Sequence, residues 1–162
     1  TWQSIKKLSF RKSPVCPGEI QECGDSSCYN NSLHSKKFLV VDDAKTLRMF
    51  ATNILVSLGA TVEQCENGEE AVKLVDEGLK RDYPNLPYDY ILMDCQMPVM
   101  NGFEATRQIR EMEKSYGVHI LIIALTADVD SSTTVTGMDF HIEKPLGKEN
   151  LLEAVRYINS KE

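Results

Sequence analysis

Phe38-Leu39-Val40-Val41-Asp42-Asp43 is a short apolar run that ends on two carboxylates. The same pattern recurs along the chain: Tyr90–Met93 before Asp94, Ile120–Leu125 before Thr126 and, more weakly, Phe140–Ile142 shortly before Lys144. Apolar runs of this length, separated by segments with helical spacing, predict strands that are buried on both faces of a parallel sheet. This pattern decides the fold class.

The segments between these runs carry apolar residues at helical spacing. Helices are predicted around Leu47–Leu58, from Gly68 past Val75, from Gly102 to about Glu113 and from about Lys148 to Ile158. Thr61–Cys65 is β-prone and supplies a further strand. Five strands that alternate with helices predict an α/β fold, a doubly wound parallel sheet with right-handed crossovers.

The polar residues that follow the strands are expected to form one site. Parallel strands end at the same edge of a sheet, and open α/β sheets bind their ligands there. Asp94 is the candidate nucleophile, because a carboxylate can attack a phosphoryl group and hold it as an aspartyl phosphate. Asp42 and Asp43 are candidate Mg²⁺ ligands, because Mg²⁺ is held by one or two carboxylates, waters and the substrate phosphate. Without a cation, the clustered carboxylates would raise one another's pKa.

Lys144 and Thr126 complete this candidate site. Lys144 offers a compact positive charge, and Thr126 a hydroxyl donor, to the oxygens of a phosphoryl group. Taken singly, each of these residues is open to a structural explanation, and the pair Asp42-Asp43 is open to the role of a helix N-cap. Their joint placement after four strands favours a functional site.

Composition and charge exclude several classes of function. The chain has 162 residues and a net charge of −6, and residues 1–36 carry five Lys/Arg against three acids, so the rest carries −8. An acidic body argues against sequence-independent binding of nucleic acid. No apolar run is long enough to span a membrane. Five cysteines without a regular framework favour a reducing, cytoplasmic compartment.

Residues 1–36 are predicted to be a flexible linker or tail, and residues 37–162 a domain. The first segment is rich in Ser, Asn, Gly and Pro and lacks a repeating apolar face. A short partner or membrane-surface helix around Trp2–Leu8 is the alternative. Cys16, Cys23, Cys28 and His34 lack the close pair that structural zinc sites use. A chain that begins with Thr1 is expected to be an excerpt.

Four motifs, in order, resemble those of a response-regulator receiver domain. They are Val41-Asp42-Asp43, Met93-Asp94 with Met97-Pro98 and Gly102, Leu125-Thr126-Ala127, and Lys144-Pro145. The segment from Ile91 to Gly102 is especially similar to receivers of plant-type hybrid sensor histidine kinases. The resemblance covers Lys37 to Glu162 and leaves residues 1–36 without a counterpart.

The resemblance implies a flavodoxin-like strand order, 2-1-3-4-5, and a place in a two-component phosphorelay. It implies that Asp94 is the phosphoacceptor, that Asp42 and Asp43 are the Mg²⁺ acids, and that Thr126 and Lys144 contact the phosphoryl group. The implied donor is a phosphohistidine on a histidine kinase or a histidine-containing phosphotransfer protein. The chain would catalyse only its own phosphorylation and dephosphorylation, as the cytosolic portion of a sensor kinase whose kinase domain lies elsewhere.

The resemblance also implies roles for residues beside the site. The backbone carbonyl of Gln96 would be a further metal ligand, and the side chains of Gln96 and Asp128 would tune dephosphorylation. His141 stands where the family places a switch aromatic, so an aromatic ring is preserved at this position. A histidine with no switching role is the alternative.

The segment between Thr126 and Lys144 departs from the family. It is shorter than usual and rich in β-branched and hydroxyl residues, which are poor helix formers. The fourth helix of the family is therefore expected to be short or missing. Because that face forms dimers in many response regulators, a monomer is expected. The loop from Glu77 to Tyr88 is expected to be long.

The docking face for the phosphotransfer partner is expected on the first helix, at Lys45, Leu47, Arg48 and Met49. By analogy these residues lie beside the acid pair, although Arg48 and Met49 are open to an ordinary surface and core role. A phosphohydrolase is the competing enzyme class, but it needs an acid two residues past the nucleophile, where Gln96 stands. An interaction module that is never phosphorylated leaves the complete site unexplained. Asp42-Asp43 would repel the phosphate of a flavin.

Overall fold

The computed structural model describes residues 33–127 and 137–161. The predicted tail lies almost wholly outside these residues. Asp128 and most of the segment expected to hold a short fourth helix lie outside them as well. Those predictions therefore stay predictions.

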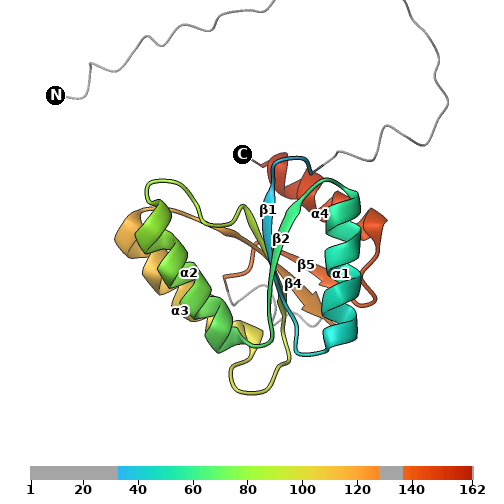
Figure 1. Ribbon diagram of the computed structural model, residues 1–162, viewed down its shortest axis with the longest axis horizontal. Coiled ribbons are helices and arrows are strands. Elements are labelled where there is room, and N and C mark those ends of the chain that lie inside the picture. The colour runs from blue at the N-terminus through green and yellow to red at the C-terminus, as the bar shows by residue number, and fades with distance from the viewer. Residues whose placement is uncertain (1–32, 128–136, 162) are drawn as a thin grey trace, which may run out of the picture.

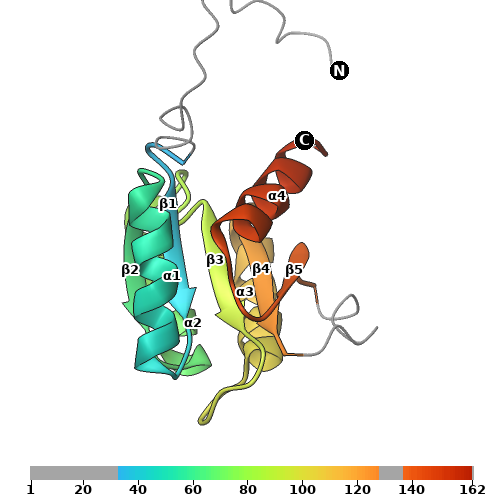
Figure 2. The same ribbon diagram turned by 90° about the vertical axis from the view of Figure 1, so that its right-hand side faces the viewer.

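The described chain forms one five-stranded parallel sheet in the order β2-β1-β3-β4-β5, which confirms the predicted fold class (Figure 2). The strands are β1 (Lys37–Val41), β2 (Thr61–Cys65), β3 (Tyr90–Asp94), β4 (Leu121–Thr126) and β5 (Phe140–Glu143). The helices are α1 (Lys45–Ser57), α2 (Gly68–Asp82), α3 (Gly102–Tyr116) and α4 (Lys148–Asn159). Each predicted run therefore became a strand, and no strand end differs from the prediction by more than one residue.

The sheet is the middle one of three layers. Helices α2 and α3 cover one face, and α1 and α4 cover the other (Figure 1). Side chains alternate along each strand, so Phe38 and Val40 pack toward α1 and α4, while Leu39 and Val41 pack toward α2 and α3. Burial on both faces explains why the strands are continuous apolar runs rather than alternating ones.

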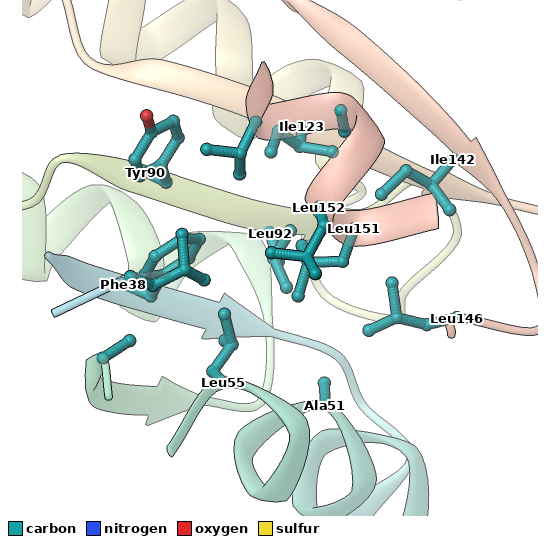
Figure 3. Close-up of a cluster of buried hydrophobic side chains, with 14 of the residues drawn as sticks. Phe38, Ala51, Leu55, Tyr90, Leu92, Ile123, Ile142, Leu146, Leu151 and Leu152 are labelled. Atoms are coloured by element: carbon teal, nitrogen blue, oxygen red, sulfur yellow. The ribbon is translucent and has the colours of Figure 1, made fainter. Parts of the chain in front are cut away.

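The core beneath α1 and α4 is built from facing side chains of the sheet and both helices (Figure 3). Phe38 and Tyr90 stack with ring centroids 4.8 Å apart across β1 and β3. Leu55 of α1 and Leu151 of α4 are fully buried against this sheet face. The scaffold under the strand ends is therefore closely packed.

The folded body begins before the predicted boundary at Lys37. Leu33 is only 2% exposed and belongs to the core under α1. Its amide donates to the carbonyl of Leu58 at 3.0 Å. A single apolar residue in a polar stretch has no periodicity, so this contact could not be predicted from the local pattern.

The ends of α2 and α3 are fixed by side-chain caps and close packing. Asn101 caps α3 by accepting from the amide of Glu104 at 2.9 Å. A Cβ at Gly102 would overlap the carbonyl oxygen of Asp94, so only glycine lets α3 start this close to β3. The prediction of a long loop from Glu77 to Tyr88 is wrong, because α2 continues to Asp82 with Leu79 fully buried.

In the two described stretches, none of the helices combines the length and the apolar character that crossing a membrane requires.

Candidate functional site

The predicted residues converge where the strands end. Asp42 and Asp43 follow β1, Asp94 ends β3, Thr126 ends β4, and Lys144 follows β5. All five line one cleft of about 210 Å³. The other residues that line it are Ala44, Leu47, Cys95, Gln96 and Ala127. The sheet therefore brings together residues that lie up to 102 positions apart in the chain.

Three carboxylates form the acidic part of the cleft. One oxygen each from Asp42, Asp43 and Asp94 lies within 4.8 Å of the others. Asp42 is 2% exposed and Asp94 5%, whereas Asp43 is exposed to solvent. Oxygen ligands in a partly open cluster fit Mg²⁺, which keeps several waters. The residues present therefore fit a divalent cation.

Burial in this cluster disfavours the ionised form of Asp94. Its burial raises the pKa of the carboxyl above the ordinary value, and the nearby Asp42 adds to this rise. The amide N–H of Gln96, which donates to Asp94 Oδ1 at 3.2 Å, and the ammonium of Lys144 oppose it. A bound cation would favour the ionised form in the same way.

Lys144 is the cationic partner of the cluster. Its Nζ lies 3.1 Å from Asp94 Oδ1 and 3.3 Å from Asp42 Oδ2. Burial alone would lower the pKa of Lys144, but these two carboxylates raise it above the usual value, so the side chain stays charged at neutral pH. The amide of Lys144 donates to the carbonyl of Thr126 at 2.8 Å, which holds the end of β5 beside the end of β4.

The remaining lining residues shape the cleft without adding charge. Thr126 is 8% exposed and stands at the end of β4. Burial, with a further contribution from Asp94, raises the pKa of Cys95 to about 11, so its thiol is neutral. The backbone of Gln96 contacts Asp94, while its side chain is exposed.

His141 lies on β5, away from the residues that line the cleft. It is half-buried, and its ring stacks on Phe140 with centroids 5.8 Å apart. In the sheet register it stands opposite Ala124, two residues before Thr126. Its predicted role as a switch stays a prediction.

The predicted docking residues of α1 separate into two groups. Lys45, Leu47 and Met49 are exposed, and Leu47 also lines the cleft. Arg48 is buried, with 6% exposure, so its assignment to an exposed docking face is corrected. The physical reason is helical spacing, because Arg48 shares the inward face of α1 with Ala51 and Leu55.

Two exposed apolar residues, one on α1 and one in the loop after β3, were not predicted from the sequence. Phe50 on α1 is 53% exposed, and Val99 in the loop after β3 is 78% exposed. Val99 also has a φ of 70°, which a β-branched residue rarely adopts. The one sequence signal for this conformation is the place of Val99 in a loop, where glycine or asparagine usually supplies a positive φ.

Comparisons with known proteins agree with this geometry. The family described as the response regulator receiver domain matches residues 38–156. The histidine kinase CKI1 of Arabidopsis thaliana is 40% identical over 168 residues, which cover 97% of this chain. This chain spans only 15% of the length of that relative.

Solved structures of receivers superpose on the described fold. The receiver domain of CKI1 from Arabidopsis thaliana, complexed with Mg²⁺ and BeF₃⁻, matches with a TM-score of 0.77 and 44% identity, covering 82% of this chain and 95% of that one. A co-crystal structure of the Saccharomyces cerevisiae phosphotransfer protein Ypd1 with the receiver domain of Ssk1 matches with a TM-score of 0.65 and 27% identity, covering 74% and 85%. The chain therefore belongs to the response regulator receiver domain family of two-component signalling.

Proposed function

We propose that this chain is a phosphorelay receiver that takes a phosphoryl group from phosphohistidine onto Asp94 and exchanges it with a histidine-containing phosphotransfer protein. The observation that carries the proposal is the placement of Lys144 Nζ, 3.1 Å from Asp94, in a cleft that also holds Asp42 and Asp43. This set offers a nucleophile, a phosphate-binding cation and oxygen ligands for a metal within a single site.

The chemistry of the transfer follows from these groups. An oxygen of Asp94 attacks the phosphorus, the bond from phosphorus to the imidazole nitrogen of the donor breaks, and the nitrogen keeps the electron pair. Lys144 contacts a phosphoryl oxygen, and the Thr126 hydroxyl donates to another. Asp42, Asp43, Asp94 and the Gln96 carbonyl would hold Mg²⁺, whose charge offsets the repulsion between two anions.

The match to the CKI1 receiver complexed with Mg²⁺ and BeF₃⁻ supports the metal. The match to the Ypd1–Ssk1 co-crystal structure supports the class of partner. The side chains of Lys45, Leu47 and Met49 are exposed on α1, where Leu47 also lines the cleft, and we propose this face as the docking site of that partner. A monomeric state and a cytosolic location are part of the proposal.

Intact mass spectrometry tests the proposal. The chain is incubated with acetyl phosphate, with Mg²⁺ or with a chelator, alongside Asp94→Asn and the exposed control Glu111→Gln. We expect a Mg²⁺-dependent gain of one phosphoryl group in the wild type and the control, and none in Asp94→Asn. If neither acetyl phosphate nor a phosphorylated phosphotransfer protein adds a phosphoryl group, the chain is an interaction module instead.

A further inference from the structure

Arg48 is a buried cation next to the acidic cluster, and the proposed chemistry does not use it. Its side chain is 7% exposed. Nη1 donates to the backbone carbonyl of Asp42 at 2.6 Å, and Nη2 donates to the carboxylate of Glu66 at 2.8 Å. Burying a guanidinium costs free energy unless it is paired and hydrogen-bonded, so these two charge-assisted bonds indicate a specific structural role for Arg48.

The first bond fixes the peptide unit between Asp42 and Asp43. The carbonyl that Arg48 holds belongs to that peptide, so the guanidinium limits its rotation. Three further bonds hold Asp42: its amide donates to the carbonyl of Cys65, its Oδ1 accepts from the amide of Ala44 at 2.8 Å, and its Oδ2 accepts from Lys144 Nζ at 3.3 Å. The direction of both carboxylates therefore depends on a peptide plane that Arg48 orients.

The second bond gives Arg48 its counterion, Glu66. Glu66 follows β2 and its side chain is 67% exposed, so a solvent-exposed carboxylate outside the acidic cluster neutralises Arg48. Because Arg48 binds the carbonyl of Asp42 and the carboxylate of Glu66, its guanidinium is engaged with groups other than the carboxylates of Asp42 and Asp43. The turn after β1 and the turn after β2 are thereby joined through one side chain.

We infer that Arg48 is a positioning residue for the metal site, acting through the Asp42 carbonyl with Glu66 as its counterion. The inference rests on the proposed function, because it assumes that the acidic cluster holds Mg²⁺. Loss of a group that hydrogen-bonds to a metal ligand and orients it typically lowers metal affinity by about 10- to 100-fold. Arg48 is expected to act at the lower end of this range, because it orients the backbone rather than a ligand atom.

Calorimetric titration with Mg²⁺ alone tests the inference on the unphosphorylated chain. Arg48→Met keeps the apolar length and is expected to weaken binding about tenfold. Arg48→Lys can still reach the Asp42 carbonyl and is expected to recover part of the loss. Leu55→Ala, a buried change on the same helix face, is the control, and it is expected to lower the melting temperature while leaving Mg²⁺ affinity unchanged.

Glu66→Gln provides a second arm that does not depend on the folding of the Arg48 variants. Without its counterion, Arg48 is expected to compete with Mg²⁺ for the carboxylates, so affinity falls severalfold. Glu69→Gln removes a charge from the exposed start of α2 and is expected to have a smaller effect. In the metal-free protein, hydrogen exchange at the Ala44 amide is expected to speed up in Arg48→Met and to stay unchanged in Leu55→Ala.

Two results would overturn the inference while leaving the proposed function standing. One is wild-type Mg²⁺ affinity in both Arg48→Met and Glu66→Gln. The other is an equal loss of affinity in Leu55→Ala, which would reduce the role of Arg48 to general stability. A wild-type chain that binds no Mg²⁺ would overturn the metal site and the inference together, so the two failures are distinguishable.

Discussion

Replacing Arg110 by Met is expected to destabilise the domain strongly, although Arg110 lies outside the site. Its Nη1 donates to both carboxylate oxygens of Glu113 at 2.7 Å, and its Nη2 donates to Asp139 at 2.8 Å. Nε also donates to the carbonyl of Gly137 at 2.8 Å. These bonds tie the end of α3 to the segment that leads into β5, and hence to the strand that precedes Lys144.

The magnitude follows from burial. The side chains of Arg110, Glu113 and Asp139 are 16%, 4% and 21% exposed. Removing one partner of a buried pair costs about 3–5 kcal/mol, because a charge is left without compensation. Glu113 still accepts from the amide of Ile120 at 2.7 Å, so we expect the lower end, about 3 kcal/mol. For a domain of this size the melting temperature would fall by roughly 10 °C.

Urea unfolding followed by circular dichroism measures this loss. Lys114→Met is the matched control, because it breaks a pair with Glu111 on the exposed side of the same helix and is expected to change nothing measurable. Adding Glu113→Gln to Arg110→Met removes the orphaned charge and is expected to recover part of the stability. A loss in Arg110→Met no larger than that in Lys114→Met would refute the reasoning.

Three further changes test other parts of the structure. In the folded protein the pKa of the Asp94 carboxyl is raised, so ionising this carboxyl destabilises the fold as the pH rises through that pKa. In metal-free protein at pH 7, Asp94→Asn is therefore expected to raise the melting temperature. Val99→Gly is expected to add about 0.5–1 kcal/mol to the free energy of unfolding in urea, by relieving a positive φ. Gly102→Ala is expected to cost about 1–3 kcal/mol and to slow phosphorylation of Asp94, since its Cβ meets the Asp94 carbonyl.

Each of these expectations has a clear contrary result. The gain from Asp94→Asn should vanish in acid, below the ordinary pKa of a carboxyl group, so a gain that is independent of pH would contradict the electrostatic explanation. A less stable Val99→Gly would mean that the valine side chain makes a contact worth more than the strain. A Gly102→Ala variant with wild-type stability would mean that the start of α3 shifts freely.

The strands and the five main site residues were predictable because their signals are local and repeated. Burial on both faces demands continuous apolar runs, and the parallel arrangement then sends Asp42, Asp94 and Thr126 to one edge. The metal and phosphoryl chemistry followed from residue types alone. The comparisons identify the family.

What the sequence did not predict depends on contacts between distant segments. The inward position of Arg48 follows from the phase of α1, which buries Arg48 with Ala51 and Leu55, whereas the predicted apolar spacing began at Leu47. The network around Arg110 joins residues up to 29 positions apart, and polar residues at that spacing carry no periodic signal. The burial of Leu33 likewise depends on a backbone bond to Leu58. Such contacts are set by the assembled fold rather than by local pattern.

Transfer from a radiolabelled phosphohistidine tests the central claim most directly. A plant phosphotransfer protein, phosphorylated on its histidine and freed of its kinase, is mixed with the chain in Mg²⁺ or in a chelator. The account predicts rapid, Mg²⁺-dependent movement of the label onto the wild type, and none onto Asp94→Asn. Label that appears on Asp94→Asn, or that stays on the phosphotransfer protein when the wild type is present, would contradict the assignment of Asp94 as the phosphoacceptor.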